Sequence, residues 1–425
     1  MQLKSILNCV EKHPGFVYRK VSWDPAATGK TLLISVTSRR GSKGYCSGCG
    51  ERGRTYDTLD PRRFQFVPLW NILVFLVYAM RRIDCKTCGP TVEMVPWAEG
   101  KKRITKSFEW FLATWAKRMC WKDVAEAFQI SWNTVFRAVE MAVDWGRARI
   151  DLTGITAIGV DEICWKKGGK NIAAKGSKFL TLVYQIDDHQ KRLLWIGENR
   201  SLATIKAFFT WFTPDRAMQL KYVCSDMWKP YLKVIAKRAS GAIHVLDRFH
   251  IMSHFSKAID EVRAGEARDM KRRGLDPVLK NSRWCWLKRP ENLTDSQGAK
   301  LNDILRLNLK TVKSYILKED FQNFWTYTSP AWAGRFLDAW CFRTMRSKID
   351  PMKKVARMLR THRELLLNWF TAKGRISSGA VEGMNNKVKV TTRKAYGFRT
   401  FKAVKLALYH NLGALPEPEF THRFC

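Results

Sequence analysis

The sequence predicts a multidomain α+β protein, and three observations support that prediction. The chain has 425 residues, 46% of them hydrophobic and 12% aromatic, which is enough for two or three domain cores. Two C-x-x-C pairs lie near the N-terminus, ahead of a region with helical periodicity. Short β-branched segments then alternate with amphipathic segments, a pattern typical of mixed α/β structure.

The charge of the chain points to a polyanionic partner. There are 75 Lys and Arg residues against 38 Asp and Glu residues, which gives a formal net charge of +37. Nucleic acid is the commonest polyanion that such a protein meets. A membrane is the competing surface, but the best apolar run, 72–80, is far shorter than the roughly 20 residues of a spanning helix. Residues 1–16 also lack the apolar core of a signal peptide. We expect a soluble intracellular protein with no membrane partner.

The cysteines divide into seven single residues and two close pairs. Eleven cysteines, most of them scattered, do not form a disulfide framework. The pairs are C-x-x-C knuckles, each followed by glycine, and they present Cys46, Cys49, Cys85 and Cys88. Four thiolates suit one tetrahedral zinc ion, and four reduced, unliganded cysteines are the alternative. Because the interval between the knuckles exceeds the ~15–20 residues of compact sites, we expect a hairpin through 64–67 and 72–82 to fill it. Residues 1–97 are therefore predicted to form a zinc-binding β module.

The next segment, 98–150, has the outline of a helix-turn-helix. Apolar residues fall at helical spacing over 108–119, a short amphipathic helix is expected over 121–128, and Ser131 is a suitable N-cap for a helix reaching residue 143. An ordinary helical hairpin is the alternative, and the net charge favours DNA binding. The residues expected on the exposed face near the start of the second helix are Asn133, Thr134 and Arg137.

A new pattern begins near residue 151 and predicts a mixed α/β core over residues 151–250. Three strands are expected in succession, followed by a helix, a strand, a second helix and a fifth strand. The expected strands are 155–165, 179–186, 191–196, 220–226 and 242–247, with helices at 202–212 and 231–239. This is the order of a ribonuclease H-like mixed sheet, in which the first and fourth strands are neighbours.

Two carboxylates mark those neighbouring strands. Asp161 interrupts a strand that should be covered on both faces, where an unpaired charge costs several kcal/mol. A metal ion is the usual resolution, and Asp226 at the end of the fourth strand would lie beside it. Glu162 follows Asp161 directly, but side chains alternate across a strand, so only one of the two can face the metal.

The rest of the chain divides into a helical insertion and a final helix. Residues 251–370 are mostly helical, basic and rich in tryptophan, and the segment is too long for a loop. The tryptophan rings could stack on unpaired bases, or they could form the core of a helical subdomain. Residues 371–415 are expected to hold an N-cap and a helix that carries Glu382 and returns to the core, followed by a tail at 416–425. The polar and cationic groups near Glu382 on that helix are Asn385, Asn386, Lys387, Lys389 and Arg393. There the acid would meet the metal and the other groups would meet phosphate, whereas a surface ion-pair face is the alternative.

These motifs together resemble the DDE-class insertion-sequence transposases, and the IS-L-three family in particular. The resemblance runs from Cys46 to about His410 and lies in Gly-Val-Asp161-Glu, Cys-Ser-Asp226-Met, Asp247-Arg-Phe-His250 and Gly-Ala-Val-Glu382-Gly-Met-Asn-Asn. It implies that Asp161, Asp226 and Glu382 form a catalytic triad that binds two Mg²⁺ ions, for which Mn²⁺ can substitute. It also implies one structural Zn²⁺ at the knuckles. Asp247 and His250 match an element that shapes the site, and the motif favours Asp161 over Glu162.

The function implied by the resemblance is cleavage and strand transfer at the terminal inverted repeats of an insertion sequence. The expected partners are double-stranded DNA, as element ends and as target, and further copies of the chain in a dimeric or larger synaptic complex. We expect a cytoplasmic, nucleoid-associated protein. Two alternatives stay open, namely a domesticated sequence-specific regulator without catalysis and a ribonuclease H-like nuclease without strand transfer.

Overall fold

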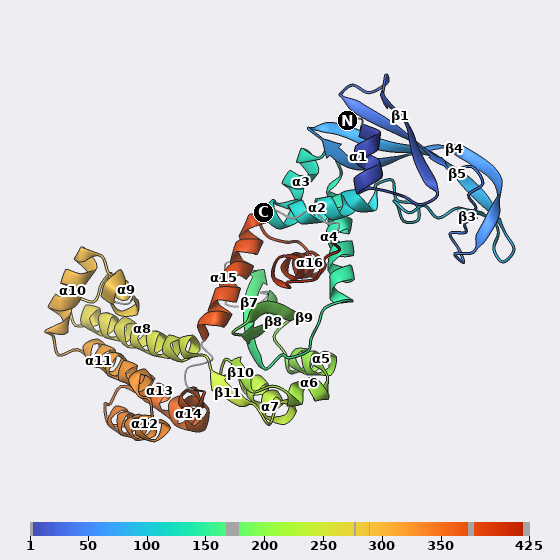
Figure 1. Ribbon diagram of the computed structural model, residues 1–425. Helices are drawn as coiled ribbons and strands as arrows, with labels where there is room; N and C mark the ends of the chain where they lie inside the picture. The colour runs from blue at the N-terminus through green and yellow to red at the C-terminus, as the bar shows by residue number, and fades with distance from the viewer. Residues whose placement is uncertain (1–2, 167–177, 276–277, 289, 373–377, 420–425) are drawn as a thin grey trace. The chain divides into compact units, whose positions relative to one another are not determined.

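The computed structural model describes residues 3–166, 178–275, 278–288, 290–372 and 378–419 (Figure 1). The chain divides into two compact units, one of Met1–Ile150 with Thr391–Cys425 and one of Asp151–Val390. The N-cap expected before the Glu382 helix, at 374–377, and the last six residues of the tail lie outside the described residues. Each unit is described by itself below.

The first unit contains a mixed β-sheet in which the long hairpin predicted between the knuckles is central. The strands are β1 (Phe16–Trp23), β2 (Thr31–Ser38), β3 (Gly44–Tyr45), β4 (Arg52–Leu69), β5 (Ile72–Cys85) and β6 (Gly89–Val92). Their order is β1-β2-β5-β4-β3, with β6 also paired to β5. The β4–β5 turn places Trp70 and Asn71 at positive φ, 47° and 63°, as a two-residue hairpin turn with a right-handed strand twist requires. A helix, α1 (Leu3–Val10), precedes the sheet and buries Leu7.

The helices of the first unit confirm the predicted helix-turn-helix. They are α2 (Lys106–Arg118), α3 (Trp121–Ala127), α4 (Trp132–Arg147) and, from the C-terminal segment, α16 (Phe401–Leu412). Ser131 caps α4, since its hydroxyl accepts a hydrogen bond from the Thr134 N–H at 3.2 Å. The C-terminal segment packs on α4 at Gly146, where an added Cβ would lie 2.7 Å from the Cβ of Leu415. The C-terminal segment of the chain therefore supports the helix-turn-helix.

The second unit contains a five-stranded mixed sheet. Its strands are β7 (Ala157–Lys166), β8 (Lys178–Asp187), β9 (Gln190–Glu198), β10 (Tyr222–Ser225) and β11 (Ile243–Leu246), in the order β11-β10-β7-β8-β9. β7, β8 and β9 are antiparallel, whereas β10 is parallel to both β7 and β11. The predicted pairing of the first and fourth strands is confirmed.

Helices cover the two faces of this sheet differently. On one face lie α5 (Leu202–Phe212), α6 (Pro214–Met218) and α7 (Lys229–Arg238), and a core that includes Ile158, Val160 and Phe208 joins them to the strands. On the other face α15 (Ser378–Lys394) meets β7 at Gly159. A Cβ at Gly159 would lie 2.4 Å from a methyl carbon of Val381, so only glycine lets α15 approach this closely.

A run of helices lies between β11 and α15, where the sequence predicts a helical insertion. It comprises α8 (Arg248–Arg272), α9 (Arg283–Leu287), α10 (Asp295–Leu305), α11 (Lys310–Gln322), α12 (Pro330–Met345), α13 (Asp350–Thr361) and α14 (Arg363–Thr371). Two apolar clusters hold it together, with Trp340 fully buried in one and Trp286 in the other. Trp284 and Trp332 are exposed, so the tryptophans serve both as core and as surface. Among the described helices, none is long and apolar enough to cross a membrane.

Candidate functional site

Asp161 and Asp226 lie at the same edge of the second unit's sheet. Cys224 on β10 pairs with Gly159 on β7, and the two strands are parallel. Asp226 and Asp161 each lie two residues beyond this pair, so the register places them level with each other. Both residues are buried, each with 9% of its surface exposed. Two buried carboxylates this close along neighbouring strands need positive partners, because desolvation penalises their charged forms.

His250 is one such partner. Its Nε2 lies 3.4 Å from Oδ1 of Asp161 and 3.8 Å from Oδ2 of Asp247. Asp247 is the N-cap of α8 and accepts a hydrogen bond from the Phe249 N–H at 2.7 Å, which fixes the turn that carries His250. The hydrogen bond with Asp161 raises the pKa of His250, and the charges of Asp247 and Asp226 act in the same direction against the effect of burial. The predicted Asp-x-x-His element therefore lies beside Asp161.

Arg200 is the second partner, and the sequence analysis missed it. Its guanidinium lies 2.7 Å from Oε2 of Glu162 and 2.9 Å from Oδ2 of Asp226, and it stacks over the Trp228 ring at 4.6 Å. Arg200 follows β9 by two residues and precedes the Ser201 N-cap of α5. The sequence shows only a lone arginine after a strand, and no local pattern links it to the carboxylates of Glu162 on β7 and Asp226 after β10.

Glu162 faces away from Asp161, as strand alternation predicts, but it still interacts with the carboxylate edge. It lies on the face of β7 that carries Ile158 and Val160, whereas Asp161 points toward α15. Burial raises the pKa of Glu162 to about 7, and the nearby charges of Asp226 and Asp161 add to this effect, while a hydrogen bond from Tyr231 opposes it. Through Arg200, Glu162 is connected to Asp226.

The helix α15 reaches the carboxylate edge through Asn385. The Asn385 amide donates a hydrogen bond to Oδ2 of Asp161, and its Oδ1 accepts one from the Tyr184 hydroxyl at 2.8 Å. Asn385 was expected at the DNA surface, but it is buried and both of its polar groups are engaged inside the unit. The other expected DNA contacts on α15, which are Asn386, Lys387, Lys389 and Arg393, are all exposed.

Glu382 lies one helical turn before Asn385 and is exposed. It lines a cavity of about 670 Å³ together with Arg248 and Phe249 from the first turn of α8. Among the described Asp, Glu and His residues, no three bring their ligand atoms within 4.8 Å of one another. The structure therefore brings Asp161 and Asp226 to one edge and places Glu382 at a cavity that also adjoins Asp247-Arg-Phe-His250.

The four knuckle cysteines form a compact cluster in the first unit. The Sγ atoms of Cys46, Cys49, Cys85 and Cys88 all lie within 4.8 Å of one another. Each knuckle ends in a glycine at positive φ, 77° at Gly50 and 70° at Gly89. The backbone N–H groups of Cys49 and Gly48 lower the pKa of the Cys46 thiol to about 6, which favours the thiolate that a metal requires. The cluster is compatible with zinc binding.

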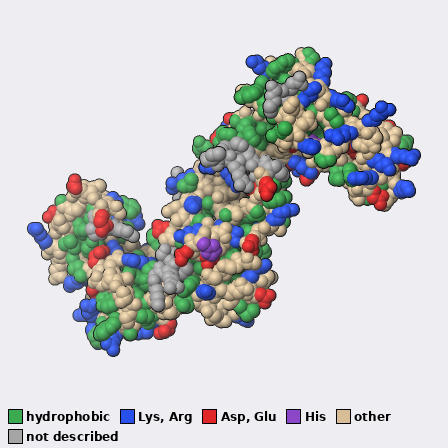
Figure 2. Space-filling view, in the orientation of Figure 1, with side chains coloured by type: hydrophobic (Ala, Val, Ile, Leu, Met, Phe, Trp, Pro, Cys, Tyr) green, Lys and Arg blue, Asp and Glu red, His purple; other side chains and the backbone are tan. Residues whose placement is uncertain are grey.

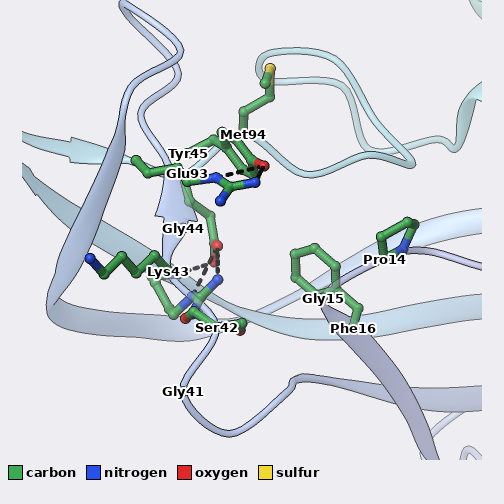
Figure 3. Close-up of a pocket in the computed structure, with 12 residues that line it drawn as sticks. Pro14, Gly15, Phe16, Gly41, Ser42, Lys43, Gly44, Tyr45, Glu93 and Met94 are labelled. Atoms are coloured by element: carbon green, nitrogen blue, oxygen red, sulfur yellow. Dashed lines mark hydrogen bonds and ion pairs between the residues drawn. The ribbon is translucent and has the colours of Figure 1, made fainter.

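A buried ion pair supports the cysteine cluster. Glu93, which bridges to Cys46 in the sheet, accepts hydrogen bonds from the Tyr78 hydroxyl at 2.5 Å and from Arg81 Nη2 at 2.7 Å. The Arg81 guanidinium also donates to the Ser42 carbonyl at 2.8 Å. Ser42 and Glu93 line a cavity of about 510 Å³ (Figure 3). These contacts fix the loop before the first knuckle to β5, which carries Cys85.

The expected recognition residues of the helix-turn-helix are accessible on α4. Asn133 and Arg137 are exposed, whereas Thr134 is half-buried and its hydroxyl contacts that of Ser131 at 2.9 Å. Behind them Trp132 stacks on Phe136, and both rings pack on Trp121 of α3. Lys and Arg side chains are spread over the visible faces of both units (Figure 2). The surface available to a polyanion is therefore wide.

Comparison with known proteins assigns the chain to a family. A family model described as transposase matches residues 158–408, and a model described as the helix-turn-helix domain of transposase family ISL3 matches residues 93–143. The chain is 29% identical over 397 residues to the transposase for insertion sequence element IS1001 of Bordetella parapertussis, covering 91% of this chain and 92% of the relative. It is 28% identical over 419 residues to the transposase for insertion sequence element IS1557 of Mycobacterium tuberculosis, covering 92% and 91%. The chain therefore belongs to transposase family ISL3, in the DDE class, and functions as a DNA-binding transposase.

Proposed function

We propose that this transposase cleaves DNA at the terminal inverted repeats of its element and joins the freed 3′-hydroxyl to target DNA, with Asp161, Asp226 and Glu382 as the metal-binding triad. The observation that supports this most directly is the carboxylate edge. Asp161 on β7 and Asp226, which directly follows β10, lie at the same edge of the sheet, and Asn385 ties α15, which carries Glu382, to Asp161. The strand order and the helices on both faces support a ribonuclease H-like core.

The three carboxylates fit a divalent metal ion as ligands. Membership of the DDE class implies that the protein uses such an ion. Carboxylate oxygens are the ligands that Mg²⁺ prefers, and Mn²⁺ accepts the same set. Arg200 and His250 lie against the same carboxylates, so the site favours positive charge at both Asp226 and Asp161. Asp161, Asp226 and Glu382 would hold two Mg²⁺ ions, which would supply activation of the attacking oxygen and stabilisation of the leaving oxygen in an in-line displacement at phosphorus.

The other residues of the edge position the triad. Asn385, held by Tyr184, orients the Asp161 carboxylate, so we assign it a positioning role in place of a DNA contact. Arg200 fixes Asp226 and balances Glu162. Asp247 caps α8 and thereby holds His250 against Asp161. No covalent protein nucleophile is required, because water and the 3′-hydroxyl are the attacking groups.

DNA contacts are proposed on both units. On α4, Asn133, Thr134 and Arg137 would read base edges in the major groove. On α15, the exposed polar groups at Asn386, Lys387, Lys389 and Arg393 would contact phosphate. One Zn²⁺ at the knuckles would stabilise the module that precedes the helix-turn-helix. The family resemblance supports a dimeric or larger complex that pairs two element ends, and binding to chromosomal DNA would place the protein at the nucleoid.

A strand-transfer assay tests the proposal. Protein, Mg²⁺ and labelled element ends are incubated with a target plasmid, and products are separated on a denaturing gel. Cleaved ends joined to the plasmid are the expected result. Cleavage without joined product would instead indicate a nuclease, and retention of DNA without cleavage would indicate a DNA-binding regulator.

A further inference from the structure

The cavity beside Glu382 has a composition that the proposed chemistry does not yet use. Its volume of about 670 Å³ lies within the ~300–1,000 Å³ range of small-ligand sites. Glu382 lines one side, and the first turn of α8 supplies Arg248 and Phe249. Residues of α8, α9 and α11 supply most of the remaining lining, including Met252, Leu287 and Gln322, and Lys288 and Glu291 from the segment after α9 complete it. All of these residues belong to the second unit.

Phe249 is the unusual feature of this cavity. Its side chain is 60% exposed, although it lies between the buried cap Asp247 and His250 at the carboxylate edge. Because the ring lines the cavity and is exposed, its aromatic face is available for a planar ligand to stack on. Its neighbour Arg248 is held in place, since Nη2 donates to Oε1 of Gln322 at 3.2 Å and the guanidinium lies over the Trp325 ring at 5.1 Å.

The charges of the lining favour a neutral planar ligand over an anion. Three cations and three acids line the cavity, which are Arg248, Lys288 and Lys318 against Glu291, Glu319 and Glu382. A free phosphate would meet no net positive charge there. A nucleobase, in contrast, has a π-face that stacks on phenylalanine and polar edges that pair with glutamate, glutamine and lysine groups.

We propose that this cavity receives one unpaired base of the DNA strand that is held at Asp161 and Asp226, with the base stacked on Phe249. The inference rests on the proposed function, because that strand must lie at the carboxylate edge for its neighbouring nucleotide to reach the cavity. A duplex base pair within its stack cannot enter a space of this size. The nucleotide next to the scissile phosphate is therefore turned out of the helix, as in enzymes that extrude a base to work on duplex DNA.

Fluorescence of 2-aminopurine, which changes when the base leaves its stack, tests this proposal. The analogue is placed in turn at each position flanking the cleavage site of an element end, and emission is measured with full-length protein before Mg²⁺ is added. We expect a change at one position with wild-type protein and with F249W, which keeps an aromatic face, and no change with F249A. The matched control is F342A, because Phe342 is also an exposed phenylalanine of the helical insertion, 53% exposed, on α12.

Cleavage of modified ends gives a second readout. On paired DNA, F249A should cleave about tenfold more slowly than wild type, or ~1.4 kcal/mol, within the range that stacking of one base provides. A substrate mismatched at the same position should recover most of the F249A rate, because the base is already unpaired, and should not rescue D161N. Equal emission changes in F249A and wild type, or an F249A rate equal to that of F342A, would overturn the inference. Cleavage by D161N would instead overturn the proposed function.

Discussion

Asn385 donates a hydrogen bond to the Asp161 carboxylate across 224 residues of sequence, and Tyr184 donates to Asn385 in turn. This chain of contacts joins β8, β7 and α15. It holds the helix of Glu382 against the strand of Asp161, with Gly159 leaving room for Val381 between them. The relative placement of β7 and α15, which carry two of the three acids of the proposed triad, therefore depends on residues outside that triad.

A substitution at Asn385 should lower both the stability and the cleavage activity of the protein, even when the new side chain has nearly the same size. In N385D a carboxylate would face Asp161, and the like charges would lower both stability and cleavage. Y184F should have a milder effect, about 1 kcal/mol in the free energy of unfolding, because one buried acceptor loses its donor. Urea unfolding and cleavage assays measure both variants. N386D, on the exposed neighbour, should keep wild-type stability and only weaken DNA binding; equal losses in N385D and N386D would contradict the positioning role.

The triad assignment predicts loss of chemistry without loss of binding. D161N, D226N and E382Q should each lower cleavage to background, because each removes a charged metal ligand, while retention of element ends in a gel-shift assay persists. D215N is the matched control, since Asp215 is an exposed aspartate of the same unit on α6. Full activity in any one of the three variants would remove that residue from the triad.

Arg200 should stabilise the fold through its two carboxylates. R200Q leaves Glu162 and Asp226 without their shared cation, and because about a third of the Arg200 side chain is exposed we expect a loss of about 1–2 kcal/mol in the free energy of unfolding. In R200Q the additional change E162Q should recover part of this loss, since a neutral amide replaces the buried acid. R238Q, at an exposed arginine of α7, serves as control. Additive effects of R200Q and E162Q would show that the pair does not interact.

The cysteine cluster predicts one zinc ion per chain. Native mass spectrometry and metal analysis of purified protein should both find it, and C46S or C85S should lose the metal and unfold the first unit's sheet at lower temperature. C9S is the control, because Cys9 is exposed on α1, outside the knuckles. A folded wild-type protein free of zinc would refute the assignment.

Acid should destabilise the first unit through His410. This residue is buried on α16, neither ring nitrogen has a hydrogen-bond partner among the described residues, and burial lowers its pKa to about 3. Since the unfolded chain titrates near 6.5, the stability that His410 contributes is complete above about pH 6.5 and falls as the pH drops toward 3.

At pH 4.5 this contribution should be reduced by roughly 3 kcal/mol. H410F should flatten the pH dependence of the urea midpoint between pH 6.5 and 4.5, whereas H189Q, at an exposed histidine of the β8–β9 turn, should not. An unchanged pH profile in H410F would show that His410 gains a proton in the folded state at no cost.

The sequence predicted the features that depend on local chemistry. The C-x-x-C-Gly spacing identified the cysteines that cluster, the N-cap Ser131 located the start of α4, and short runs of β-branched and apolar residues located the five strands of the second unit. Strand order followed from the order of elements, because only a few topologies are compatible with it. The separation of Asp161 and Glu162 onto opposite faces followed from the two-residue period of a strand.

What the sequence could not determine is which side chains meet. Arg200 lies 26 residues from Asp226, and Asn385 lies 224 residues from Asp161. No periodicity or spacing encodes such contacts, because they depend on the packing of helices and strands against each other. For the same reason Asn385 looked like a surface residue in its own helix and proved to be buried against β7. The sequence determined the elements and the candidate acids, and the tertiary structure decided which residues hold those acids in place.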